Sequence, residues 1–194
     1  MPGLADRSVP DEVREQVLAA AYDELTRWGI DRFSIVALAD RHRLDPVVIR
    51  QHWGSEEGLV IDVLLHLPNT ERITPPDLGS LRSDLWALAV GMGAYVQSDI
   101  GRSLQVTHVI GNPDLPTARI RQAVWRARSD RLRVVFERAR ERGELLDGID
   151  DLTVLEMLFA PINMRALFTG EPVDEDYCKA ISELVWRAVK ADPT

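Results

Sequence analysis

Cysteine is almost absent from this 194-residue chain. Cys178 stands alone, so the sequence offers neither a disulfide framework nor a thiolate metal site. Lysine is nearly as scarce, since none occurs before Lys179, and the formal net charge is −8. This acidity argues against a general nucleic-acid-binding protein, because neutralised phosphates supply most non-specific affinity.

Long apolar runs and targeting signals are also missing. The N-terminal residues have no apolar centre of the signal-peptide kind, and no uninterrupted apolar run approaches the roughly 18 residues of a membrane span. We therefore expect a cytoplasmic protein with no membrane partner.

Catalytic motifs are absent as well. The four histidines form no H-E-x-x-H pattern, and the sequence has no Gly-x-Ser-x-Gly turn and no glycine-rich phosphate loop. Asp150 and Asp151 open a helical pattern and are better interpreted as helix caps than as an acid–base pair. The sequence predicts no enzyme, no cofactor and no metal site.

What the chain does contain is helical periodicity along most of its length, without strand-like alternation. We predict an all-α fold of about nine helices. A segment rich in Pro and Asn, 68–76, divides the pattern into an N-terminal domain, 1–67, and a C-terminal domain, 68–194. The helices outside the central N-terminal stretch are expected near 10–28, 55–67, 78–98, 99–109, 115–142, 152–168 and 174–190.

The stretch from Ser34 to Trp53 predicts a helix-turn-helix. Ser34 is a plausible N-cap for a first helix, and Asp45 followed by Pro46 begins a second one after only a short turn. Ser55 is expected to cap the next helix. In a helix-turn-helix the second helix can lie in the major groove of DNA.

Charge in this stretch opposes that of the whole chain. Residues 41–53 contain Arg41, Arg43 and Arg50 against the single acid Asp45, a local net charge of +2. A recognition helix needs positive charge in this region.

Residues 13–60 resemble the DNA-binding domain of TetR-family transcriptional regulators. The matching positions are Ala19-Ala20-Ala21, Gly29, Phe33, Ser34, Ile35, Leu38, Ala39, Leu44, Ile49, His52, Trp53, Ser55, Glu57 and Leu59. More weakly, R-G-E-L at 142–145 and T-G-E-P at 169–172 resemble a C-terminal regulatory domain of that family. The resemblance implies a homodimeric, all-helical repressor that releases a double-stranded DNA operator when a small-molecule effector enters its C-terminal regulatory and dimerisation domain.

Several positions depart from the family pattern. His42-Arg43 stands where the turn usually has Gly or Ala-Gly, and Val47-Val48 where the recognition helix usually has Gly-Thr. Arg50 replaces a phosphate-contacting Tyr and can bond a phosphate or a guanine edge. The two valines could reduce base contact or pack on thymine methyl groups. Glu56 replaces a Lys and would repel phosphate.

These considerations identify three groups of candidate residues. Trp53 is not among them, because it is expected in the core. Asn163 is a candidate ligand contact, and an inter-helix hydrogen bond is its alternative role. The DNA-binding candidates are Ser34, Arg41, Arg43, Val47, Val48, Arg50, Gln51 and His52. The effector-pocket candidates, chosen as Met and aromatic residues with a few polar tips, are Trp86, Met92, Tyr95, His108, Trp125, Met157, Asn163 and Met164. The dimer candidates, on the last two helices, are Leu155, Leu158, Phe159, Ile162, Ile181, Leu184, Val185 and Ala188.

Two interpretations remain open. The first is a ligand-responsive DNA-binding regulator, a repressor by its resemblance. The second is a ligand- or protein-binding module of the same fold that has lost operator affinity. Nine arginines between residues 117 and 143 are expected to form a solvated face paired with acids at i,i+4, with an anionic partner as the lesser alternative.

Overall fold

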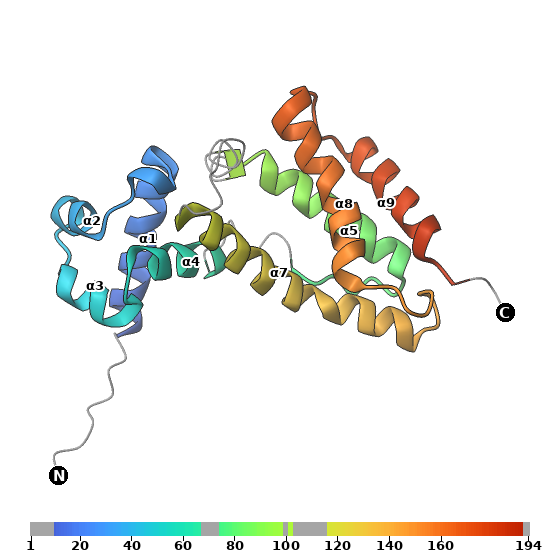
Figure 1. Cartoon of the computed structure of the whole chain (residues 1–194), viewed down its shortest axis with the longest axis horizontal. Helices are drawn as coiled ribbons and strands as arrows, with labels where there is room; N and C mark the ends of the chain where they lie inside the picture. Colours follow the sequence, from blue (N-terminus) through green and yellow to red (C-terminus); the bar gives the residue numbers. More distant parts are fainter. Residues whose placement is uncertain (1–9, 67–73, 99–100, 103–115, 192–194) are drawn as a thin grey trace, which may run out of the picture. The chain divides into compact units, whose positions relative to one another are not determined.

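The computed structural model describes residues 10–66, 74–98, 101–102 and 116–191 (Figure 1). Within them the chain forms eight α-helices and no strand, which confirms the all-α prediction. The helix expected over 99–109 lies outside the described residues, apart from Gly101 and Arg102. The described residues form two compact units, 10–66 with 116–124, and 74–98 and 101–102 with 125–191. The first unit thus includes 116–124, which the sequence-based division at 68 assigned to the second domain.

Helix α1, Asp11–Trp28, forms the core of the first unit. One stripe of α1 is buried, with Val17, Ala21 and Leu25 at helical spacing and at most 1% exposed. The helix ends where Gly29 adopts a φ of +74°, a left-handed value that favours glycine. A 3₁₀ turn, η1 (Ile30–Arg32), then leads into the next helix.

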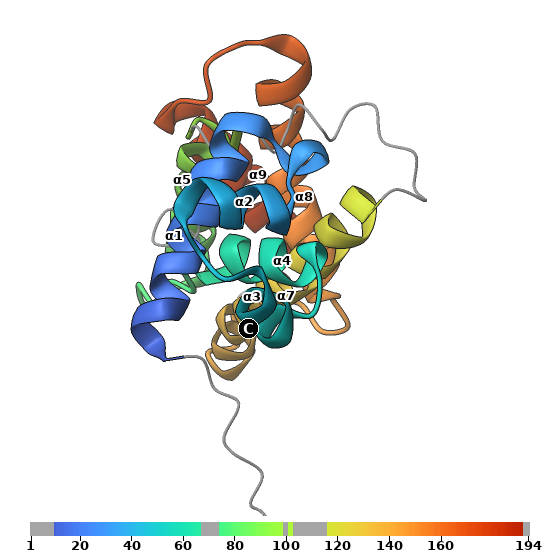
Figure 2. The same ribbon diagram turned by 90° about the vertical axis from the view of Figure 1, so that its left-hand side faces the viewer.

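Helices α2 (Ile35–His42) and α3 (Pro46–Trp53) form the predicted helix-turn-helix. Both helices are labelled in Figure 2. Arg43 makes the turn with a φ of 55°, and the Leu44 amide bonds to the Ala39 carbonyl at 2.9 Å. Helix α4, Glu56–His66, follows, and the Ser55 hydroxyl caps it by accepting from the Gly58 amide at 3.1 Å. The caps predicted at Asp45 and Ser55 are confirmed.

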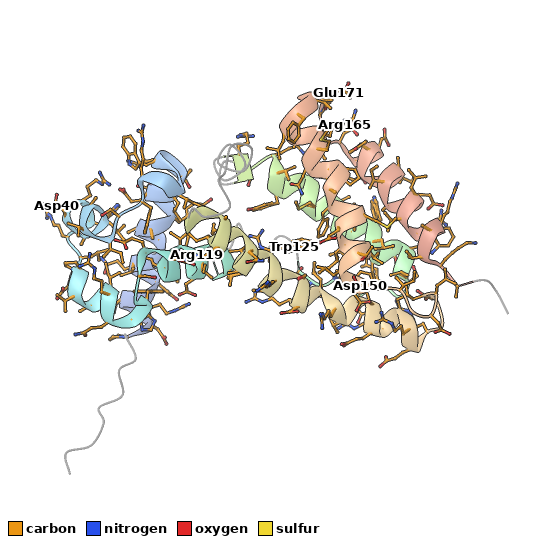
Figure 3. All side chains as sticks on the ribbon, in the orientation of Figure 1. Asp40, Arg119, Trp125, Asp150, Arg165 and Glu171 are labelled. Atoms are coloured by element: carbon orange, nitrogen blue, oxygen red, sulfur yellow. The ribbon has the colours of Figure 1, made fainter. Side chains whose placement is uncertain are left out.

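The second unit is a helical bundle. It contains α5 (Leu81–Val96), α8 (Asp151–Met164) and α9 (Glu175–Val189), which pack against one another, and it includes residues 125–141 of α7 (Pro116–Glu141) (Figure 1). The carboxylate of Asp150, labelled in Figure 3, caps α8 by accepting from the amide of Thr153 at 2.9 Å. The segment after α7 pairs with the end of α9, because the Leu146 amide bonds to the Val189 carbonyl at 2.9 Å.

A glycine allows α5 and α9 to approach closely. A Cβ built on Gly93 would lie 3.0 Å from the Cys178 sulfur and 3.1 Å from a methyl carbon of Val173, both buried residues. Burial raises the pKa of the Cys178 thiol, and Asp174 and Glu175 add to this effect. Cys178 is therefore a packing residue of this bundle and not a reactive thiolate.

A buried carboxylate anchors the chain before α5. Asp84 is fully buried and accepts from the Leu78 amide at 2.8 Å, while the Arg142 guanidinium lies 3.5 Å from its other oxygen. The Ser80 side chain caps α5 by accepting from the Ser83 amide at 3.2 Å. These bonds explain why α5 begins at Leu81 and not near residue 78 as predicted.

Helix α8 contains Pro161 and continues through it to Met164, followed by a π-helical turn, η2 (Arg165–Thr169). Arg165 and Glu171, labelled together in Figure 3, form an ion pair of 2.6 Å that holds this turn. The Arg165 guanidinium also stacks on the Tyr177 ring, 4.0 Å from its centre.

By length and composition alone, residues 151–169 are apolar enough to cross a membrane. The sequence expectation that no segment meets this condition was therefore too strict. Core helices of soluble proteins pass the same test, and Leu155, Leu158 and Ile162 are fully buried in the bundle. The apolar side chains of this segment that the bundle leaves uncovered include Met157, Met164 and Phe168.

Candidate functional site

The recognition helix α3 presents a mixed apolar and polar face to solvent. Val47 is 58% exposed, and Arg50 and Gln51, three and four residues later, are exposed on the same face. Ile49 is fully buried and anchors the opposite side, while Val48 is half-buried. The exposed group offers a methyl surface, a guanidinium and an amide, which can read thymine methyl, guanine and adenine respectively.

Both ends of α3 are held by a carboxylate. At its start the Asp45 side chain accepts from the Val47 amide at 2.8 Å, and Pro46 occupies the first helical position. At its end the indole N–H of Trp53 donates to Asp62 of α4 at 2.8 Å. The sequence predicts that Trp53 lies in the core. The structure leaves it half-buried, because its polar edge donates this hydrogen bond.

Asp62 connects three helices. The Arg14 guanidinium of α1 donates to both of its carboxylate oxygens, at 2.9 and 3.0 Å, and Trp53 of α3 donates to one of them. The side chains of Arg14 and Asp62 are 31% and 18% exposed. Because α1, α3 and α4 meet at one carboxylate, the orientation of α3 depends directly on α4.

The start of α2 differs from the sequence prediction. Ser34 occupies the N-cap position, but its hydroxyl makes no capping bond. The Glu56 carboxylate, in the first turn of α4, accepts from the Ile35 amide at 3.4 Å instead. The Ser34 hydroxyl thus remains available for a phosphate, and Glu56, expected only to repel phosphate, has a structural role.

The three arginines of the predicted basic face have different surroundings. Arg41 forms an ion pair with Glu24 of α1, and the His42 ring nitrogen Nε2 lies 3.3 Å from the same carboxylate. Arg43 and Arg50 are exposed, and neither pairs with an acid among the residues that the structure describes. His52 is exposed with its ring edge-on to Trp53, 4.4 Å between centres.

The predicted effector-pocket residues do not gather around one described cavity. Met92 and Tyr95 are 8% exposed, and the Arg128 guanidinium lies 4.7 Å from the centre of the Tyr95 ring. Trp125, labelled in Figure 3, packs edge-on against Phe159, with 6.1 Å between ring centres.

The other pocket candidates are dispersed. Met157 and Met164 are 43% and 54% exposed. The Asn163 amide donates to the Phe159 carbonyl of its own helix at 3.1 Å, so the predicted inter-helix bond is not the one it makes. Trp86 lines a separate hollow, and His108 lies outside the described residues.

Two hollows are described in the second unit. One of about 630 Å³ is lined by Trp86 of α5 and by the first turns of α9. Another of about 260 Å³ is lined by residues of α7 and α8, among them Arg126, Asp130, Arg133 and Asp151. Both have mixed polar and apolar walls, and neither contains the cluster of methionine and aromatic residues that the sequence suggested.

The predicted dimer residues separate into two groups. Leu155, Leu158, Phe159, Ile162 and Val185 are buried within the chain, at most 4% exposed. On α9, Leu184 is 62% exposed, Ala188 is exposed and Ile181 is half-buried. A partner could therefore contact only the latter group directly, because the bundle core already covers the former.

Several arginines at the end of α7 and directly after it pair with acids outside the helix. Arg138 pairs with Asp77 at 3.5 Å, Arg140 with Asp151, and Arg142 with Glu144 at 2.9 Å. Arg119, labelled in Figure 3, lies 3.8 Å from Glu57 of α4. Within α7, Arg133 pairs with Asp130 at 3.6 Å, three residues before it, and the expected pairing at i,i+4 stays a prediction for the rest of the helix.

Sequence reasoning missed Glu24 and Asp62. Glu24 occupies a position of the buried stripe of α1, three residues after Ala21 and seven after Val17, and this spacing is a detectable signal. Asp62 follows the apolar positions Leu59 and Val60 of α4 without such a signal. The partners of both carboxylates lie on other helices, far away along the chain, and a single sequence does not show such pairs.

Known proteins share both the fold and the sequence pattern. Residues 75–185 match the family model described as tetracyclin repressor-like, C-terminal domain. An uncharacterized HTH-type transcriptional regulator of Bacillus subtilis, YdeS, is 25% identical over 98% of this chain and 96% of its own. The HTH-type regulator AqdR of Rhodococcus erythropolis is 26% identical over 82% and 77%.

Solved structures agree in fold. The TetR family transcription regulator SCO0332 superposes with a TM-score of 0.74 at 23% identity, covering 94% of this chain and 100% of that one. SmeT in its triclosan complex superposes with a TM-score of 0.58 at 19% identity, over 93% of each chain. With the family model covering most of the second unit and the helix-turn-helix in the first, this chain belongs to the TetR family of transcriptional regulators.

Proposed function

We propose that this protein is a repressor that binds its operator as a homodimer and releases it when a small molecule binds the second unit. The observation that carries this proposal is the exposed face of α3, where Val47, Arg50 and Gln51 project from a helix held at both ends. A rigidly held helix with exposed groups of this kind suits major-groove recognition.

Phosphate contacts would position the unit and base contacts would specify the sequence. Ser34 and Arg43 lie at the two ends of α2, and the Ser34 hydroxyl and the Arg43 guanidinium would bind phosphates, while Arg50 would bind a phosphate or a guanine edge. Val47 and Gln51 would contact base edges, with Val48 and His52 at the border of the interface. These assignments rest on exposure and on the chemistry of each side chain.

Apolar residues on α8 and α9 support dimerisation. Met157, Met164 and Leu184 are between 43% and 62% exposed, and a second copy would cover them. A two-fold dimer would place two α3 helices on successive half-sites of a palindrome. Gel filtration of Leu184→Glu should show a smaller species than wild type or Lys179→Glu, an exposed change on the same helix. Equal elution volumes of all three would contradict this interface.

The effector would bind in the second unit. The aromatic side chains of Tyr95, Trp125 and Phe159 are largely covered, with the Arg128 cation over Tyr95, so an apolar ring system would stack on them where the bundle opens. SmeT, a structural relative, is known in complex with triclosan. By analogy we propose an aromatic or hydrophobic small molecule as effector.

Helix α4 would transmit effector binding to DNA. Its Asp62 contacts α3 through Trp53, and its Glu57 lies beside Arg119 of α7, the helix that belongs to both units. A shift of α4 would therefore reorient α3. Reciprocity requires that operator DNA lower effector affinity by the factor by which effector lowers operator affinity.

Binding to the DNA that flanks its own gene, measured across a salt series, tests the proposal. A specific complex whose affinity falls steeply with salt is the expected result. Binding no tighter than to random DNA would exclude the repressor and favour the alternative, a ligand-binding module of the same fold. Thermal shift with triclosan and other aromatic compounds would then identify effectors, each retested for release of the DNA.

A further inference from the structure

Glu24 is a carboxylate in the apolar stripe of α1. It is 5% exposed and shares this stripe with Val17, Ala21 and Leu25, which are almost completely buried. Removing a carboxylate from water is costly unless cations and hydrogen-bond donors compensate. The helix-turn-helix must therefore supply partners for this side chain.

Each oxygen of Glu24 faces one residue at the end of α2. The guanidinium of Arg41 donates to Oε2, and Nε2 of His42 lies 3.3 Å from Oε1. The Arg41 side chain is 47% exposed and that of His42 is 28% exposed, so the cluster is buried on its acidic side and open on its basic side. Both basic residues also lie in the last turn of α2, where the helix dipole favours positive charge.

The turn of the helix-turn-helix begins directly after this cluster. Arg43 follows His42 and adopts the left-handed conformation, and Asp45, two residues later, caps α3. Holding the last turn of α2 against α1 therefore fixes the point from which the chain enters α3.

We propose that Glu24 is a positioning residue for DNA recognition: through Arg41 and His42 it fastens the end of α2 to α1, and it withholds Arg41 from the phosphate backbone. Arg41 thus acts through Glu24, whereas Arg43 and Arg50, which have no acidic partner among the described residues, face the DNA. The DNA part of this inference rests on the proposed function, and the fastening part does not.

The salt dependence of binding to a random-sequence duplex shows whether Arg41 or Arg43 contacts a phosphate. Each lost phosphate contact should reduce the slope of log affinity against log salt by about 0.9. We expect this reduction for Arg43→Gln but no change for Arg41→Gln, which removes the same charge two residues away. A reduction of about 0.9 in Arg41→Gln would overturn the assignment.

Melting temperatures of the full chain test the fastening without DNA. Glu24→Gln and Arg41→Gln should each lower the transition by roughly 2–8 °C, and the double variant by less than the sum. Glu15→Gln removes an equal charge from an exposed position of α1 and should leave the transition unchanged. Additive losses in the double variant would overturn the fastening.

Specificity provides the readout that simple destabilisation would not change. At a temperature where all variants are folded, Arg41→Gln should lower the ratio of specific to random-duplex affinity by about 2- to 30-fold. Arg41→Lys, which keeps a cation beside Glu24, should restore the ratio. The specific duplex is the one that wild type selects from a random pool. An unchanged ratio in Arg41→Gln would contradict positioning.

The two proposals fail in different ways. If wild type selects no sequence, the repressor function is wrong, while the melting temperatures still decide whether Glu24 fastens α2. If wild type selects a sequence but the Arg41 variants follow Arg43→Gln, only the positioning role is wrong.

Discussion

Replacing Asp62 with Asn should weaken both the fold of the first unit and its discrimination among DNA sequences. The amide keeps the size of the side chain and one acceptor oxygen. It loses the charge, and its N–H groups would face either the Arg14 guanidinium or the Trp53 indole, both of which are donors. At least one of the bonds that join α1, α3 and α4 must therefore break.

The expected loss of stability in Asp62→Asn can be estimated from the exposure of Arg14 and Asp62. Arg14 and Asp62 are 31% and 18% exposed, and one guanidinium nitrogen contacts both carboxylate oxygens. The pair therefore contributes more than a surface salt bridge but less than a fully buried one, about 1–2 kcal/mol. Weakening the bond from Trp53 adds roughly 0.5 kcal/mol. A loss of about 2 kcal/mol corresponds to a decrease in melting temperature of roughly 4–8 °C for a chain of this size.

The DNA assay separates orientation from charge. Removing an acid should by itself strengthen binding to random DNA, and Glu57→Gln, on the same helix but not bonded to α3, measures that effect. We expect Asp62→Asn to lower specific affinity while random-DNA affinity rises as in the control. Trp53→Phe, which removes the donor N–H together with part of the ring system, should also lower specificity. A wild-type melting temperature in Asp62→Asn would refute the reasoning.

Three further predictions concern other parts of the chain. Wild type should bind the selected duplex roughly fourfold more tightly with thymine than with uracil at one position, because one methyl contact contributes about 0.8 kcal/mol. Val47→Ala should abolish this difference in affinity. Equal discrimination in both proteins would exclude the contact. Gly93→Ala should lower the free energy of unfolding by about 1 kcal/mol in denaturant titrations, since crowding outweighs the gain in helix propensity, and Cys178→Ala should recover part of the loss. Hydrogen bonds from the side chain and amide of Thr153 lower the pKa of Asp150 below its ordinary 3.8. The cap therefore stabilises the fold above that pH, and this stabilisation is lost as the pH falls through the folded-state pKa. Acid unfolding of Asp150→Asn should lack this pH-dependent loss of stability.

Local chemistry made the helix boundaries predictable. Gly29 and Gly143 end α1 and α7 in left-handed conformations, and Asp45 caps α3 within two residues of its own position. Such signals lie within one turn of the helix that they begin or end, so the sequence alone displays them.

Side-chain partners across helices were not predictable in the same way. Ser34 has the chemistry of a cap, but Glu56, 22 residues later, accepts the Ile35 amide. Arg138 belongs to a helix with its own acids and nevertheless pairs with Asp77. In each case tertiary packing brings together groups that the spacing along the chain does not relate.

The effector-pocket candidates show a third case. They were chosen by composition, and Met92 lies in the core while Met157 and Met164 lie on the surface. Helical spacing cannot distinguish these environments where a helix is apolar around most of its circumference, as α8 is. Burial then depends on the neighbouring helices.

The cluster of Glu24, Arg41 and His42 also restricts how this protein can diverge. A change at Glu24 alone leaves two basic groups without their acid, and a change at Arg41 alone leaves a buried carboxylate short of its main partner. Replacement of the acid by an apolar residue becomes tolerable only when smaller or uncharged residues arise at 41 and 42. Among descendants of this sequence, the three positions should therefore be inherited and exchanged as a set.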